Sequence, residues 1–151
     1  MERDVYFGRL KLSGEEHRST LLAANNYAGS LLNLKRFEEA KSLCLKVMPV
    51  ARRILGDSND TTLRMRWAYA QALYADTGGT LDDLREAVTT LEDATRIARR
   101  VLGGTHPTTT GIEISLRRAR AGPAIGAVRR HQGKAAVPKV TVAAETEMTS
   151  R

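Results

Sequence analysis

An internal repeat of 42 residues constrains this chain more than any other feature of its sequence. The offset carries residues of the first copy onto identical residues of the second: Gly14 onto Gly56, Tyr27 onto Tyr69, and Leu31 onto Leu73. Each copy has an apolar-periodic segment, a break, a second apolar-periodic segment and a closing glycine, which predicts a helical hairpin. Hairpins at a fixed period form an α-solenoid, so we expect an all-α fold of antiparallel helical hairpins.

The second helices repeat at a longer offset than the first helices. Beyond Tyr74 an offset of 47 carries Glu39-Ala40 onto Glu86-Ala87 and Leu55-Gly56 onto Leu102-Gly103. The second unit therefore has five extra residues between its helices. We interpret them as a longer turn that Gly78-Gly79 opens and that Thr80, followed by Asp82-Asp83, closes as a helix cap.

The apolar spacing predicts helices over residues 19–34, 37–55, 61–75 and 81–102, and a last helix that begins at Pro107. Ser19 or Thr20 is expected to cap the first of these, and Leu22 and Val101 are expected to point inward. Pro49 lies inside the second helix, where it lacks an N–H donor and crowds the carbonyl of Leu45. We therefore expect a kink or a break near Met48.

The chain divides into three parts. Residues 1–13 read as the remnant of a preceding second helix, because the alternating apolar residues there have no partner strand. Residues 14–121 form the repeat array of about two and a half repeats, divided into 14–55, 56–102 and a capping helix at 103–121. Residues 122–151 lack large apolar side chains and are expected to be a disordered basic tail, with five positive and two negative side chains.

The repeats resemble a known family. Asn25-Asn26-Tyr27-Ala28, Phe37 with Glu39-Ala40, and the closure from Leu102-Gly103 to His106-Pro107 are similar to the tetratricopeptide repeats of about 42 residues found in kinesin light chains and related adaptors. The similarity covers roughly residues 14–112. Trp67-Ala68 stands where a second Asn-Asn pair would be.

The resemblance implies a protein-interaction module, a scaffold or adaptor, whose first helices line a concave face that holds a peptide. The peptide-groove candidates are the residues that match the Asn-Asn pair and the arginines on first helices: Asn25, Asn26, Arg64, Arg66, Arg117 and Arg120. A positive lining would favour an acidic peptide through charge-assisted contacts. Trp67 and Tyr69 are expected in the core and outside the site.

No residue pattern indicates an enzyme, a cofactor or a metal site. His17 and His106 occupy equivalent turns, with Asn59 at the third, and a residue repeated in every turn is structural because a catalytic group is needed once. Adjacent carboxylates point in different directions on a helix. Cys44 is the single cysteine and is expected to be a small packing residue.

The charge and the hydropathy of the chain limit the classes of partner and the location that we expect. The net charge of +7 is divided between the array and the tail, and no RNA or DNA motif is present, so we expect a protein or peptide partner, with acidic character, rather than nucleic acid. No apolar run is long enough to span a membrane, and we expect a cytoplasmic protein. Self-association through the end helices is a further expectation. The alternatives are a basic nucleic-acid-associated protein and a terminal fragment of a larger repeat assembly without a groove of its own.

Overall fold

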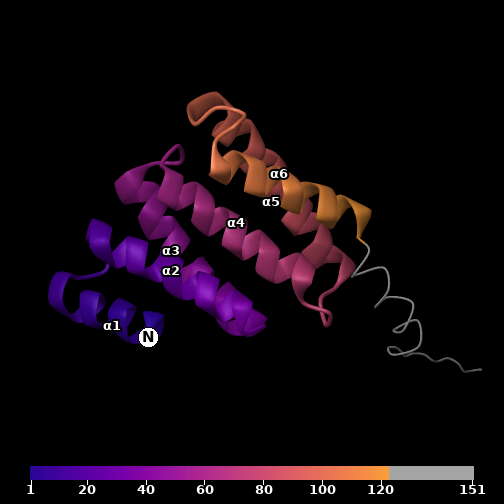
Figure 1. Cartoon of the computed structure of the whole chain (residues 1–151). Helices are drawn as coiled ribbons and strands as arrows, with labels where there is room; N and C mark the ends of the chain where they lie inside the picture. The colour runs from indigo at the N-terminus through magenta and orange to yellow at the C-terminus, as the bar shows by residue number, and fades with distance from the viewer. Residues whose placement is uncertain (123–151) are drawn as a thin grey trace, which may run out of the picture.

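The computed structural model describes residues 1–122, and these residues form an all-α array (Figure 1). The predicted tail lies outside the described residues from residue 123 onward. Each helix runs antiparallel to the next along the chain. The helices are α1 (Glu2–Ser13), α2 (Arg18–Asn33), α3 (Phe37–Leu55), α4 (Asp60–Ala75), α5 (Leu81–Val101) and α6 (Pro107–Ala121).

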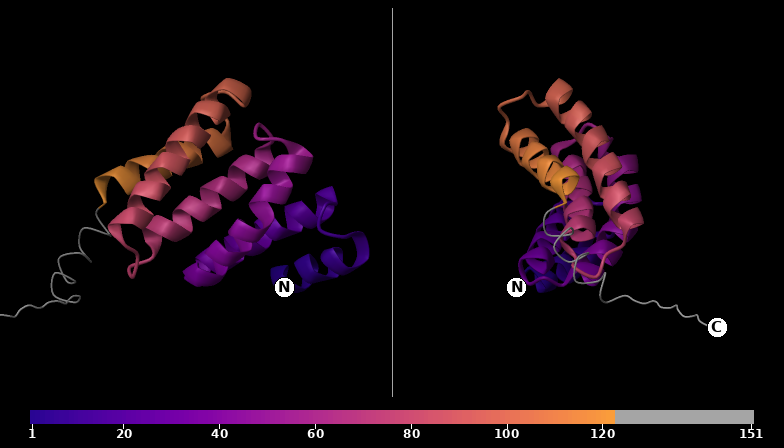
Figure 2. Two further views of the ribbon diagram at one scale, coloured as in Figure 1. Left: turned by 180° about the vertical axis from the view of Figure 1, so that it is seen from behind. Right: turned by 90° about the vertical axis from the view of Figure 1, so that its right-hand side faces the viewer.

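The helices form an inner and an outer layer (Figure 2). Neighbours in sequence pack against one another, and in addition α2 packs on α4 and α4 packs on α6. The outer helices α1, α3 and α5 make no comparably close contacts with one another. Because the inner helices are closer together than the outer ones, the array curves, and α2, α4 and α6 line its concave side.

The residues before α2, α4 and α6 cap these helices. His17 Nδ1 accepts a hydrogen bond from the Ser19 amide at 3.1 Å, Asn59 Oδ1 from Thr61 at 2.8 Å, and His106 Nδ1 from Thr108 at 3.1 Å. The repeated position is therefore structural, as the sequence predicted. The cap predicted at Ser19 or Thr20 is wrong. The N-cap is His17, two residues before Ser19, and its imidazole accepts from the Ser19 amide in the first turn of α2.

The turns before these caps begin at a glycine with a positive φ, of 85° at Gly14, 90° at Gly56 and 93° at Gly103. A side chain at this φ would be strained, so the closing glycine of each repeat is a backbone requirement. In the first two turns a threonine on the following helix also donates to the outer helix. Thr20 bonds the carbonyl of Arg9 at 3.3 Å, and Thr62 bonds that of Ala51 at 3.4 Å.

The third turn departs from this pattern. The equivalent threonine, Thr109, has a buried hydroxyl without a partner. The carbonyl at the matching position, Ala98, already accepts from the amides of Leu102 at 2.7 Å and Gly103 at 3.2 Å. In the second turn the Gly56 amide donates to Arg52 instead, one residue beyond Ala51, so the Gly103 amide occupies an acceptor that is left to the threonine in the earlier turn.

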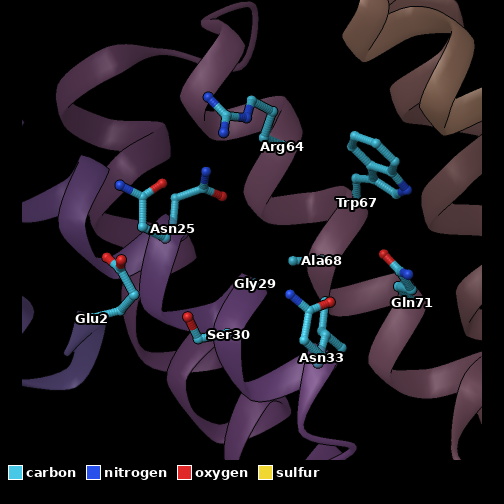
Figure 3. A pocket seen from close by; sticks show the side chains of 11 residues that line it. Glu2, Asn25, Gly29, Ser30, Asn33, Arg64, Trp67, Ala68 and Gln71 are labelled. Carbon is cyan, nitrogen blue, oxygen red and sulfur yellow. The ribbon is translucent and has the colours of Figure 1, made fainter.

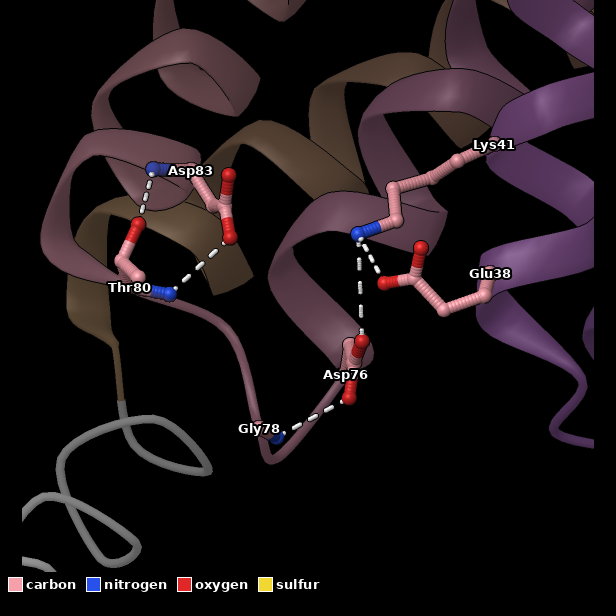
Figure 4. A network of polar contacts seen from close by, with 6 residues as sticks. All are labelled: Glu38, Lys41, Asp76, Gly78, Thr80 and Asp83. Atoms are coloured by element: carbon pink, nitrogen blue, oxygen red, sulfur yellow. Dashed lines mark hydrogen bonds and ion pairs between the residues drawn. The ribbon is translucent and has the colours of Figure 1, made fainter. Parts of the chain in front are cut away.

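The five inserted residues do not all lie in the turn. The turn from α4 to α5 spans residues 76–80, against residues 34–36 in the first repeat, and the other three residues, Leu81, Asp82 and Asp83, belong to α5. The predicted cap is confirmed: Thr80 Oγ1 accepts from the Asp83 amide at 3.1 Å, and the Thr80 amide donates to Asp83 Oδ2 at 3.0 Å (Figure 4). This reciprocal capping box is why the helix extends backward.

Lys41 on α3 holds the same turn in place (Figure 4). Its Nζ lies 2.6 Å from Glu38 Oε2 and 4.0 Å from Asp76 Oδ2, and Asp76 Oδ1 accepts from the Gly78 amide at 2.9 Å. The hydrogen bond that the Lys41 ammonium donates to Glu38 raises the pKa of Lys41, and the nearby aspartates act in the same direction. Lys41 thus remains charged and links α3 to the long turn.

Of the kink or break predicted near Met48, the break does not occur, because α3 is continuous from Phe37 to Leu55 with Pro49 inside it. Pro49 and Leu45 both lie on the exposed side of the helix. The Leu45 carbonyl that loses its helical partner is therefore able to bond to water instead. Two residues predicted to point inward are also exposed, Leu22 at 45% on α2 and Val101 at 44% at the end of α5.

Trp67 packs on a glycine in the core between α4 and α6. A Cβ at Gly111 would lie 2.2 Å from Cη2 of the Trp67 ring, so only glycine permits this contact. Trp67 Nε1 donates to Ser115 Oγ at 2.7 Å, and the Tyr74 hydroxyl donates to the same oxygen at 3.1 Å. The indole therefore joins α4 to α6 by both packing and hydrogen bonding.

We expect Gly111→Ala to destabilise the protein, because the added methyl overlaps the Trp67 ring and overpacking costs about 1–3 kcal/mol. Gly29 on α2 is the matched control, since a Cβ there meets nothing within 4 Å. Gly29→Ala should stabilise the helix by about 0.5–1 kcal/mol. Urea unfolding followed by circular dichroism compares the two. Equal effects would show that the Trp67–Gly111 contact is looser than described.

Candidate functional site

A groove on the concave side lies between α2 and α4 and reaches the start of α1 (Figure 3). Its volume is about 360 Å³. Three of the predicted residues, Asn25, Asn26 and Arg64, line it together. The other lining residues are mostly small or polar, and they are Glu2, Gly29, Ser30, Leu32, Asn33, Trp67, Ala68 and Gln71.

Asn25 is the least exposed amide of the groove. The residue retains 6% of its accessible surface, and its side chain lines the groove without a hydrogen-bond partner among residues 1–122. Its amide atoms are not among the buried unpartnered atoms, so the exposed part of the residue is the carboxamide at the groove surface. Asn25 therefore presents both a donor and an acceptor to whatever enters the groove.

Other polar side chains extend this surface along the groove. Asn26, Asn33, Gln71 and Ser30 border the same space and also lack a side-chain hydrogen bond within the described residues. Carboxamides both donate and accept, as does a peptide group. The lining is therefore chemically matched to a polypeptide backbone rather than to one charge.

Arg64 supplies the one positive charge of this lining. Its side chain is 38% exposed, and its Nη1 lies 3.9 Å from Asp60 Oδ2, one turn earlier on α4. Such an exposed ion pair contributes little to the free energy of folding, so the guanidinium can leave Asp60 and bind a ligand. Glu2 from α1 supplies the one negative charge. The groove thus has one charge of each sign, in place of the positive lining that the arginines predicted.

Arg66 does not line the groove. Its side chain is 12% exposed and faces α5, where its Nη2 lies 3.8 Å from Asp93 Oδ2. Burial lowers the pKa of this guanidinium, with a further contribution from the nearby positive charges of Arg52 and Arg96. Position 66 is two residues from position 64, and on a helix residues two apart point in different directions.

Arg117 and Arg120 lie at a separate hollow of about 380 Å³ between α5 and α6. Arg120 Nη2 is 2.7 Å from Glu92 Oε2, and Arg99 forms an ion pair with Glu113 beside it. Arg117 forms no ion pair within residues 1–122. The six predicted residues are therefore divided among the groove, a buried position and this second hollow.

Comparison with known proteins identifies the part of the chain that carries the groove asparagines. Residues 20–60 match the family model of the tetratricopeptide repeat, and they include nearly all of α2 and all of α3. This segment is a tetratricopeptide repeat. A search of curated proteins found none that matches the chain. No described helix has the length and the apolar content that crossing a membrane requires.

Sequence reasoning placed Trp67 outside the site, and the structure places it in the lining. It occupies, in the second hairpin, the position that Asn25 occupies in the tetratricopeptide repeat. The 42-residue offset carries Asn25 onto Trp67, and this equivalence could have predicted Trp67 as a groove residue. An aromatic ring stands in the groove where an amide would otherwise be, so the second hairpin contributes apolar surface to the groove.

Cys44 belongs to the core of the tetratricopeptide repeat and not to a site. It is 1% exposed, and burial raises the pKa of its thiol from 9.0 to about 12. The nucleophilic thiolate is therefore suppressed at neutral pH. Within residues 1–122, no group of three His, Cys, Asp or Glu side chains is arranged to hold a metal ion.

We expect Cys44 to react with iodoacetamide far more slowly in the folded protein than in guanidinium chloride at pH 9.0, the ordinary pKa of the thiol. Only the unfolded thiol ionises between pH 9.0 and about 12, so the free energy of unfolding should also fall as the pH rises through this range. Cys44→Ala should lack this thiol contribution. Equally fast labelling of the folded protein would contradict the described burial.

Proposed function

We propose that the protein is an interaction module that binds an extended peptide in the groove between α2 and α4. The observation that carries this proposal is Asn25, a residue that is only 6% exposed, whose carboxamide lines the groove and has no partner in the described chain. The tetratricopeptide repeat at residues 20–60 supports it, because such repeats generally mediate protein–protein interaction.

The affinity of such a complex would come mainly from the amides. A peptide backbone that enters the groove offers a carbonyl and an N–H to the Asn25 carboxamide, and its contact replaces water at these amide atoms. Asn26, Asn33 and Gln71 provide further donors and acceptors along the same path. Trp67 would add an apolar surface for one side chain of the peptide.

The charges give the peptide a direction. An acidic side chain near Arg64 gains a charge-assisted contact, whereas the same side chain near Glu2 would meet a like charge. We therefore propose a peptide with its acidic residue at the α4 side of the groove. A scaffold or adaptor role in the cytoplasm, similar to that of kinesin light chain repeats, completes the proposal and rests on the sequence resemblance.

We expect Asn25→Ala to weaken peptide binding by about 1–3 kcal/mol, the usual cost of deleting one partner of a desolvated hydrogen bond. Peptides enriched from a displayed random library by the full chain would serve as ligands. Trp67, the single tryptophan of the chain, lines the groove and reports binding by its fluorescence. Calorimetry gives the affinities.

Arg64→Glu should weaken those enriched peptides that contain an acidic residue and leave their Asp-to-Asn or Glu-to-Gln versions nearly unchanged. Arg117→Glu is the matched control, because Arg117 is exposed and lies outside the groove. It should bind like the unaltered protein. A library that yields no binder, or affinities that do not respond to Asn25→Ala, would refute the proposed groove.

A further inference from the structure

An exposed apolar stripe lies along α1, and none of its residues belongs to the hydrophobic core of residues 1–122. The stripe consists of Met1, Val5, Gly8 and Leu12, which recur at the three- or four-residue spacing of one helix face. Met1 is 91% exposed, Val5 42% and Leu12 84%. Tyr6 and Leu10 belong to the opposite face, which packs into the core. Figures 1 and 2 show α1 at the end of the array, with α2 on one side only.

Gly8 lies at the centre of this stripe, and a Cβ at this position would meet nothing within 4 Å. The centre of the stripe is thus open surface rather than a contact within the fold. A glycine between Val5 and Leu12 lets a second helix approach the backbone of α1 closely. The stripe therefore has the form of a helix-packing face.

Charges flank the stripe in a self-complementary order. Asp4 and Lys11 lie along one flank, and Glu2 and Arg9 lie along the other, each pair seven residues and two turns apart. The acidic member is nearer the start of α1 in both pairs, and the basic member is nearer the end. Glu2, Arg9 and Lys11 form no ion pair within the described chain, and Asp4 contacts only the exposed Arg3, at 3.6 Å.

We propose that α1 is a self-association surface, on which two copies of the chain dimerise by antiparallel packing of their stripes. A two-fold axis between Val5 and Gly8 would place Asp4 of each copy within about 3 Å, along the helix axis, of Lys11 of the other, and Glu2 equally close to Arg9, which these side chains can span. Parallel packing would instead set like charges opposite each other. The charge order therefore selects a second, inverted copy as the occupant.

The other end of the array does not fit the stripe. Its hollow between α5 and α6 holds ion pairs of Arg120 with Glu92 and of Arg99 with Glu113. Covering these with Val5 and Leu12 would desolvate charges without offering them partners. End-to-end stacking of copies is thus disfavoured relative to the symmetric pair. The dimer and the peptide groove share only Glu2 among the residues argued for each, because the groove amides lie on α2 and α4.

Sedimentation equilibrium of the full chain over a wide concentration range tests the proposal. We expect a reversible monomer–dimer equilibrium, since one helix face is a small interface. Leu12→Glu should raise the dissociation constant by at least about tenfold, because both copies lose an apolar contact and gain a desolvated charge. Ile114→Glu, at a position that is 41% exposed on α6, is the control and should leave the dimer intact.

A charge exchange tests the antiparallel order itself. Asp4→Lys and Lys11→Asp should each weaken the dimer, by roughly threefold to tenfold, and the double variant should recover the original affinity. Circular dichroism confirms that each variant is folded. Asn25→Ala should leave the dimer unchanged, so failure of the peptide-binding proposal can be distinguished from failure of the dimer proposal. A chain that is monomeric at every concentration, oligomers beyond the dimer, or a double variant weaker than both single variants would overturn the proposal.

Discussion

The burial of α4 is the constraint on which the rest of the described structure depends. This helix packs against α2, α3, α5 and α6, and more than half of its residues are buried. A helical hairpin cannot hide its apolar stripe alone, so each neighbour of α4 is needed to remove that stripe from water. Small residues on both sides, such as Ala70 and Ala87 at 0% exposure, let the helices approach closely.

The groove is a consequence of the same packing. Since α2 and α4 are adjacent in the inner layer, Asn25 and Arg64 come to line one space although they are distant in sequence. Trp67 connects this space to α6, because one side of its indole lines the groove while its ring packs on Gly111 and its Nε1 bonds Ser115. The surface that a peptide would contact is therefore built on rigid helices.

Much of the fold could be predicted from the sequence, because the signals are local. Apolar spacing gave the bounds of α2, α3, α4 and α5 and the start of α6 to within one residue, and the positive-φ glycines at positions 14, 56 and 103 marked each turn. The errors came from choices that local rules leave open. His17 competes with Ser19 as a cap. The helix start at Leu81 and the Thr80 cap were correct, but three of the five inserted residues belong to α5 and not to the longer turn. Pro49 is tolerated because it lies on the exposed side of α3.

For the candidate site, too, local features could be predicted and the arrangement in space could not. The sequence by itself determined the helical hairpins, their 42-residue period and the asparagines of the inner helix, because periodicity and turn chemistry act between residues close in the chain. Only the tertiary structure decided which side chains share a space. The rotation of each helix about its axis is set by packing against several neighbours at once. This rotation brings Arg64 and Trp67 to the groove, turns Arg66 toward Asp93, and leaves Arg117 and Arg120 at the far end of the array.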